Sequence, residues 1–142
     1  MTKIFAALFA LQTILSPLPS WQPAAEDVEA IAQTLYGECR GAETEAEKEA
    51  VAWVILNRVD AGYADTVLGV VSAPGQFAGY DPAHPLWPEL VEVARRVLTL
   101  HHREQLGESI ARVLGPEYLW FSGDGVRNWF RDSYGGGTYI TF

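Results

Sequence analysis

Cysteine is almost absent from this sequence, since Cys39 is the only one in 142 residues. A single cysteine cannot form an internal disulfide, and it excludes every metal site that needs two or more thiolates. Histidine is scarce as well. Its three residues include the adjacent pair His101 and His102, but neither an H-E-x-x-H motif nor a third metal ligand is evident. We therefore expect no metal site and no cofactor.

Basic residues are also few. The chain has 10 Lys and Arg against 18 Asp and Glu, which gives a net charge of −8. Binding to the phosphate backbone of nucleic acids needs clustered Lys and Arg, so a nucleic-acid partner is excluded from our expectations. The same acidic balance disfavours a polybasic membrane-binding surface and favours solubility.

Long apolar runs are missing except near the start, where Lys3 precedes the mostly apolar residues 4–15 and two prolines follow in residues 16–20. This run is shorter than the roughly 20 residues that span a bilayer. Its basic start, short apolar middle and helix-breaking end are typical of a secretory signal peptide. We predict a signal peptide over residues 1–24 and one exported, periplasmic or extracellular, monomeric domain over residues 25–142, without a stable membrane anchor. An N-terminal helix docked on the core is the alternative.

What the sequence does contain is helical periodicity. A first helix is expected to start at Glu26 and a second at Glu43, and Thr44 with Glu47 forms a capping box there. The second helix is apolar nearly all round, which predicts that it is the central, buried helix. A short helix is expected over residues 64–71, and a third long helix over residues 89–101, after Pro88. The first helix would bury a stripe of apolar residues: Val28, Ile31, Ala32, Leu35 and Cys39.

The C-terminal part changes in character. Residues 118–121 and 139–142 are short aromatic and β-branched runs that predict strands, and turn signals occur at residues 122–125 and 135–137. The two strands are expected to form a small antiparallel ribbon that encloses residues 128–132. The predicted fold class is therefore α+β, mostly helical, with a small ribbon at the C-terminal end.

One carboxylate stands out in the segment over residues 35–41. At 100° per residue, Glu38 lies about 20° from Ile31 around the first helix, on its apolar side. A carboxyl group held against apolar surface is hard to ionise and can deliver a proton near neutral pH. Gly37 and Gly41 would permit a sharp turn and the close approach of a bulky substrate. The alternative is that Glu38 is an ordinary solvated charge at a helix end.

Four blocks occur in an order and spacing that resemble a known family. They are residues 36–41 (YGECRG), 50–59 (AVAWVILNRV), 66–71 (TVLGVV) and 74–77 (PGQF). Together they resemble the SleB/CwlJ-like cell-wall hydrolases. The resemblance implies a lysozyme-like, lytic-transglycosylase-like fold that acts on the glycan strands of peptidoglycan, with Glu38 as the catalytic acid.

The same resemblance places the Gln76-Phe77 pair near the substrate cleft and matches Asn57 and Arg58 to the family's N-R-V. We expect substrate contacts from Arg40, Gln76, Phe77, Ser122 and Asp124, and a structural role for Asn57. The sequence departs from the family pattern in three places. Cys39 replaces the usual alanine, Ala42 replaces an acidic residue, and residues 138–142 lack the histidine of a Gly-x-His-x-Phe pattern.

The number of carboxyl groups at the site would decide the mechanism. Ordinary glycoside hydrolysis uses two, about 5–5.5 Å apart for retention or about 6.5–9.5 Å apart for inversion. The possible partners for Glu38 are more often turn or cap residues: Asp65, Asp81, Asp124 and Asp132. A lytic transglycosylase needs only one carboxyl group, which acts first as acid and then as base. We therefore expect cleavage between N-acetylmuramic acid and N-acetylglucosamine by transglycosylation.

Two other function classes remain open at this point. One is a cysteine-dependent peptidoglycan amidase or peptidase, in which Cys39 would act with His84, His101 or His102. The other is a non-catalytic glycan-binding module. Its stacking platforms would be tryptophans, each of which could equally belong to the core: Trp53, Trp87, Trp120 and Trp129.

Overall fold

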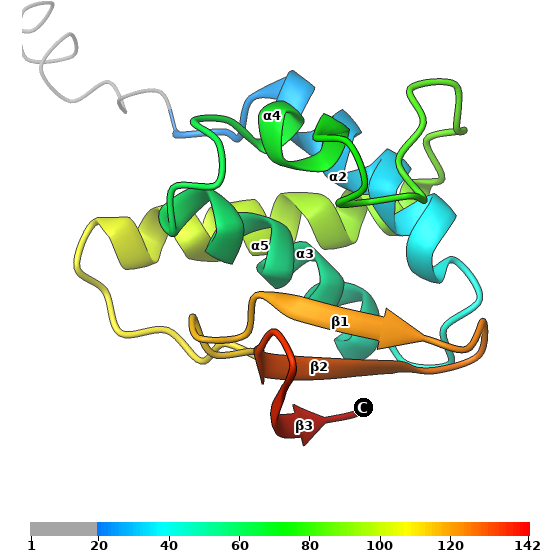
Figure 1. Cartoon of the computed structure of the whole chain (residues 1–142). Coiled ribbons are helices and arrows are strands. Elements are labelled where there is room, and N and C mark those ends of the chain that lie inside the picture. Colours follow the sequence, from blue (N-terminus) through cyan, green and yellow to red (C-terminus); the bar gives the residue numbers. More distant parts are fainter. Residues whose placement is uncertain (1–19) are drawn as a thin grey trace, which may run out of the picture.

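The computed structural model of this protein describes residues 20–142. Residues 1–19, which carry most of the predicted signal peptide, lie outside the described residues. From residue 20 onwards the chain forms four helices, α2 to α5, followed by a three-stranded sheet (Figure 1). Within this part, no helix is both long and apolar enough to cross a membrane. The mostly helical α+β class predicted from the sequence is confirmed.

Helix α3 (Glu45–Asp60) lies at the centre of the helical layer, against α2 (Ala25–Cys39), α4 (Val67–Ser72) and α5 (Pro88–Gln105) (Figure 1). Its residues 50–58 are all buried, as the continuous apolar run predicted. The predicted stripe on α2 is buried too, with Ile31 and Leu35 inaccessible to solvent. The core therefore forms where helical faces rich in Val, Leu and Ile meet.

The helix ends follow from capping chemistry. Thr44 precedes α3 and its hydroxyl accepts the N–H of Glu47 at 3.2 Å, while Thr66 precedes α4 and accepts the N–H of Gly69 at 3.0 Å. Helix α4 therefore starts after Thr66 rather than at residue 64, because the threonine hydroxyl satisfies a free amide of the first turn. Pro88 opens α5, and this helix continues beyond the predicted end to Gln105.

The sheet consists of β1 (Trp120–Gly123), β2 (Asn128–Ser133) and β3 (Gly136–Ile140), all antiparallel, in the order β1-β2-β3. The predicted ribbon was wrong in one respect. The segment it was expected to enclose is the middle strand, and β1 and β3 each pair with it rather than with one another. Alternation in β2 explains the difference, because Asn128 and Phe130 are buried while Trp129 and Arg131 are less so.

Phe130 anchors the sheet to the helical layer. Its side chain is fully buried, and its ring lies 5.7 Å from that of Phe121 and 5.6 Å from that of Phe142. A second link comes from Glu47 on α3, whose Oε1 accepts the backbone N–H of Asn128 at 2.6 Å and its side-chain amide at 2.8 Å. The capping box is thus only half formed, because the Glu47 carboxylate binds the sheet instead of returning to Thr44.

Candidate active site

A cavity of about 620 Å³ opens between the C-terminal end of α2, the loop after α4 and the turn that joins β1 to β2. In Figure 1 this is the side of the molecule where the end of α2 faces the β1–β2 turn. Apart from Arg58 of α3, the walls come from three stretches that are distant in sequence, namely residues 37–42, residues 75, 76 and 78, and residues 121–123 with 125–128. The volume lies within the usual range for pockets that bind small molecules or parts of polymers.

Glu38 lies in the last turn of α2 and lines this cavity. Its side chain is half-buried, and its Oε1 accepts the backbone N–H of Gly79 at 2.9 Å. Within residues 20–142, the other carboxylate oxygen accepts no hydrogen bond. The carboxylate of this cavity-lining residue is thus fixed at one oxygen by the backbone of the loop after α4.

Two glycines make this fixation possible. A Cβ atom on Gly37 would overlap the carbonyl oxygen of Gly79, and a Cβ on Gly79 would lie 2.7 Å from the carbonyl carbon of Gly37 and 2.9 Å from Cδ of Glu38. Gly37 therefore allows the close approach of another chain segment, whereas a Cβ on Gly41 would meet nothing within 4 Å. The Gly79 carbonyl oxygen is also 3.0 Å from Nε2 of His84.

Gln76 is exposed on the cavity wall and is oriented by Arg58. The Nη1 group of Arg58 donates to Oε1 of Gln76 at 2.8 Å, and its Nε donates to the carbonyl oxygen of Leu119 at 2.8 Å. A guanidinium can only donate, so the Gln76 oxygen must face Arg58 and its amide nitrogen remains available as a donor. Arg58 itself is 6% exposed, and this burial lowers its pKa.

Of the predicted site residues, the structure brings together Glu38, Arg40, Gln76 and Ser122 as walls of one cavity. Phe77 and Asp124 do not line it. Phe77 is 5% exposed and packs beneath the Arg58 guanidinium, 4.9 Å away, and against the ring of Phe121. The predicted substrate contact of Phe77 therefore finds no support in its position.

Asp124 has a local role in the β1–β2 turn. Its Oδ1 accepts the backbone N–H groups of Val126 and Arg127, both at 2.9 Å, and these bonds hold the pKa of its carboxyl below the ordinary value. A carboxylate that binds its own turn is typical of such positions. Its predicted contact with substrate likewise finds no support.

Among the charged and amide-bearing residues that line the cavity, sequence reasoning missed three: Arg58, Arg127 and Asn128. For Arg58 a signal existed, because a charged residue on an otherwise apolar, buried helix must have partners. Arg127 and Asn128 lie where the turn meets β2, and their position depends on strand pairing that the sequence did not reveal.

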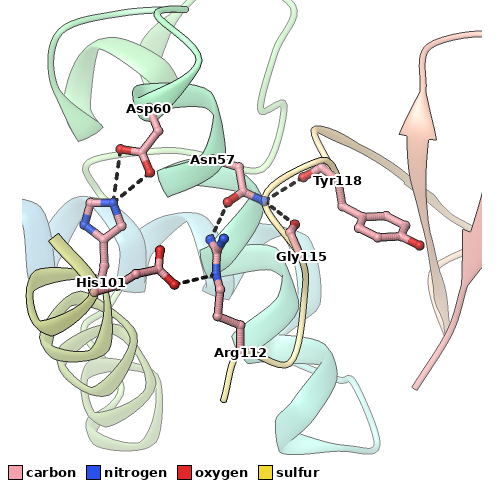
Figure 2. A network of polar contacts seen from close by, with 7 residues as sticks. Asn57, Asp60, His101, Arg112, Gly115 and Tyr118 are labelled. Atoms are coloured by element: carbon pink, nitrogen blue, oxygen red, sulfur yellow. Dashed lines mark hydrogen bonds and ion pairs between the residues drawn. The ribbon is translucent and has the colours of Figure 1, made fainter. Parts of the chain in front are cut away.

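Asn57 binds the segment of the chain that leads into β1, as Figure 2 shows. Its side-chain amide donates to the carbonyl oxygens of Gly115 and Tyr118, both at 2.9 Å, and its oxygen accepts from Nη2 of Arg112. Arg112 in turn lies 4.0 Å over the ring of Trp53. These bonds agree with the structural role expected for Asn57.

The cysteine hypothesis is disfavoured by the surroundings of Cys39. The thiol residue is 6% exposed, and burial, aided by the charge of Glu47, raises the pKa of Cys39 to about 12. Each histidine is engaged elsewhere, since His84 contacts the Gly79 carbonyl, His101 lies 2.9 Å from the Asp60 carboxylate, and His102 stacks on Trp21. A thiol that remains protonated and has no neighbouring base is a poor nucleophile.

The tryptophans offered as stacking platforms lie away from the cavity walls. Trp53 is fully buried in the core, and Trp120 and Trp129 are half-buried on neighbouring strands of the sheet. Trp87 is 37% exposed and packs edge-on against Tyr36, with ring centroids 5.0 Å apart. Their positions give the non-catalytic binding hypothesis no particular support.

Comparison with known proteins places this architecture in a family. The family model described as Cell Wall Hydrolase matches residues 42–133, about two thirds of the chain, from the loop before α3 to the end of β2. The match begins after Glu38 and so does not include that residue. No curated protein and no solved structure matches the chain. The chain therefore belongs to the SleB/CwlJ-type family of cell wall hydrolases, whose substrate is peptidoglycan.

Proposed function

We propose that this enzyme cleaves glycan strands between N-acetylmuramic acid and N-acetylglucosamine as a lytic transglycosylase, with Glu38 as acid and then base. The observation that carries this proposal is the composition of the cavity wall. Among residues 20–142, Glu38 is the only carboxylate that lines it. A mechanism that needs a single carboxyl group fits this arrangement better than one that needs a pair.

The other acidic residues considered as partners have different surroundings. Asp81 accepts the N–H of Ala83 at 2.8 Å, and Asp132 accepts the N–H of Thr138 at 2.7 Å. Asp124 binds its own turn, and Asp65 is exposed just before α4. Each of them therefore acts locally or faces solvent away from the cavity walls, which disfavours a second catalytic carboxylate.

The proposed reaction proceeds in two proton transfers. Protonated Glu38 donates its proton to the glycosidic oxygen as the bond from C1 of the muramic acid breaks, and the N-acetylglucosamine end leaves as an alcohol. The carboxylate then accepts the proton of the muramic acid's own 6-hydroxyl as that oxygen bonds to C1. The product carries a 1,6-anhydro ring, and Glu38 is protonated again, so no water is consumed.

The surrounding groups would position the sugar. Gln76, whose amide is oriented by Arg58, and Ser122 both line the cavity, and the amide nitrogen and the hydroxyl can donate to sugar oxygens. The Gly79 N–H holds one oxygen of Glu38, so that the other faces the substrate. Holding the acid and the scissile bond together accounts for a large part of a rate enhancement of this kind.

The test is mass spectrometry of purified sacculi digested with the wild-type enzyme and with Glu38→Gln. We expect the wild type to release fragments with 1,6-anhydromuramic ends, and we expect Glu38→Gln to lose about 10²- to 10⁴-fold in rate, as removal of a general acid does. Glu29→Gln is the matched control, because Glu29 lies exposed on the same helix and away from the cavity.

Three results would contradict parts of this proposal. Reducing muramic ends would indicate hydrolysis, and cleaved peptide bonds with intact glycan strands would indicate an amidase or peptidase. Undiminished glycan cleavage by Glu38→Gln would remove Glu38 as the catalyst.

We also propose that the enzyme acts as an exported monomer, since its substrate lies outside the cytoplasmic membrane. The basic and apolar start of the sequence supports removal of residues 1–24 during export. N-terminal sequencing of the protein recovered outside the cytoplasm, together with its mass in solution, tests both points. A retained Met1 or a stable oligomer would contradict them.

A further inference from the structure

The cavity has a charge opposite to that of the molecule. The chain carries a net charge of −8, yet three arginines and only one carboxylate, Glu38, line the cavity within residues 20–142. The three are Arg40, Arg58 and Arg127, out of 10 basic residues in the whole sequence. Clefts lined by one sign of charge concentrate ligands of the opposite sign.

The three arginines differ in how far they are committed to the fold. Arg58 is buried and holds both the Leu119 carbonyl and Gln76, so it is part of the wall. Arg40 is exposed and donates from Nη1 to the Tyr36 carbonyl at 2.9 Å, with its guanidinium 4.7 Å above the Tyr36 ring. This bond occupies one of five guanidinium N–H groups, and the others remain available.

Arg127 lines the cavity from the β1–β2 turn. It is exposed in the β1–β2 turn, where its backbone N–H is held by Asp124. The Asp124 carboxylate is bound to that backbone through Oδ1 and does not line the cavity. Arg40, next to the end of α2, and Arg127, in the β1–β2 turn, therefore both line the cavity that Glu38 lines.

We propose that Arg40 and Arg127 bind a carboxylate of the glycan strand, so that the enzyme selects anionic over neutral glycan. This inference rests on the proposed function, because it assigns a charge requirement to the same cavity. In peptidoglycan, carboxylates occur in two places: on the lactyl group of muramic acid where the peptide is missing, and on the stem peptide where it is present. Arginine suits either one, since its planar fork can hold both oxygens of a carboxylate.

The inference also accounts for how an acidic enzyme approaches an acidic polymer. Elsewhere the like charges of protein and substrate repel, so a local basic site fixes where the strand can bind and in which register. Carboxylates that recur along the strand would thereby place a muramic acid, rather than a glucosamine, next to Glu38. Arg40 and Arg127 are then specificity-determining residues.

The test measures binding by titration calorimetry in the Glu38→Gln background, with three soluble glycan preparations from sonicated sacculi. One is untreated, one has been stripped of stem peptides by an amidase and keeps lactyl carboxylates, and one has had its carboxyl groups converted to methylamides. We expect Kd for the methylamide preparation to be about tenfold higher than for the untreated one, as for lost charge-assisted hydrogen bonds. Adding Arg40→Gln and Arg127→Gln together should abolish that difference.

Arg95→Gln is the matched control, because it removes the same charge from an exposed position on α5 and should keep the tenfold preference. Equal binding of untreated and methylamide glycan by Glu38→Gln would overturn the inference, and so would a preference that survives in the double arginine variant. Stripped strands that bind like untreated ones would identify the lactyl carboxylate as sufficient. Stripped strands that bind like the methylamide would identify the stem peptide.

The two proposals fail separately. Wild-type enzyme that releases anhydro fragments without a charge preference would retain the catalytic proposal and overturn this one. A charge preference without any glycan cleavage would retain this inference and overturn the catalytic proposal.

Discussion

Two glutamates on consecutive helices show how the same side chain can serve chemistry or architecture. Glu38 on α2 and Glu47 on α3 each accept a backbone N–H from a distant segment, from Gly79 and Asn128 respectively. Glu47 is 2% exposed and takes two hydrogen bonds at one oxygen, whereas Glu38 is half-buried and faces a cavity. Glu38, the candidate catalyst, differs from the structural residue Glu47 mainly in its access to a cavity that can hold a ligand, and less in the number of its hydrogen bonds.

The strongest test of this comparison replaces each glutamate by glutamine and measures both activity and stability. Glu38→Gln should reduce the rate of glycan cleavage by about 10²- to 10⁴-fold and leave the free energy of unfolding nearly unchanged. Glu47→Gln should do the reverse, lowering the free energy of unfolding by about 1–2 kcal/mol, because the neutral amide oxygen accepts the two N–H groups of Asn128 in weaker hydrogen bonds than a charged carboxylate oxygen does. Denaturant unfolding and turnover measured on both variants check the pair. Equal losses of stability would break the distinction.

The anchor of Glu38 can be broken without touching its carboxyl group. In Gly79→Ala the new methyl group would lie 2.9 Å from Cδ of Glu38 and 2.7 Å from the Gly37 carbonyl carbon, so the loop must move away. We expect activity to fall at least about tenfold and the free energy of unfolding to fall by about 1–3 kcal/mol, as for other overpacked contacts.

Gly135→Ala is the control for this experiment. A Cβ atom at this position would meet nothing within 4 Å, so the substitution should have little effect on turnover or unfolding. Full activity in Gly79→Ala would show that the Gly79 N–H is dispensable for placing Glu38.

Cys39 lies between the two glutamates in sequence, and its titration gives the smallest of the expected effects, a change of stability with pH. Its pKa is raised from an ordinary value of 9.0 to about 12, first by burial and then by the charges of Glu47 and Glu38. The unfolded chain therefore loses this proton at lower pH than the folded one. Stability that is intact below pH 9 should fall between about pH 9 and 12, by up to about 1.4 kcal/mol per pH unit.

Unfolding measured against pH for wild type and Cys39→Ala checks this expectation, because the variant should lack that part of the decline. Thiol reagents should also label native Cys39 far more slowly than unfolded protein. Fast labelling that inactivates the native enzyme would return the cysteine hypothesis to consideration.

Local signals in the sequence were enough to predict the helical layer. Apolar periodicity located α2 and α3, and the Thr44 capping box located the start of α3, whereas α4 starts three residues later than predicted. Such features depend on neighbours three or four positions away, which a sequence displays directly. The placement of Glu38 on the apolar side of α2 belongs to the same class of prediction.

The sheet and the cavity walls depend on contacts between distant residues, and there the sequence was a poorer guide. Nothing local indicates that Asn128 would bind Glu47 or that β2 would be the middle strand. Arg127 was missed for this reason. Phe77 and Asp124 do not line the cavity although they are next to Gln76 and close to Ser122 in sequence, because proximity in sequence does not decide which residues form its walls. In the sheet, pairing register is such a long-range property, because a slip of one residue turns every side chain of a strand to the other face.

The close crossing of Gly37 and Gly79, together with walls drawn from residues 37–42, 121–123 and 125–128, bears on when the enzyme can become active. A nascent chain in which only the helices have formed would contain Glu38 but would lack the cavity wall that the β1–β2 hairpin provides, and so could not bind a glycan strand fully. The cavity would be complete only when the β1–β2 hairpin has folded beside the end of α2, and catalytic activity would appear at that stage. An enzyme that digests its surroundings would thus stay harmless until its folding is finished.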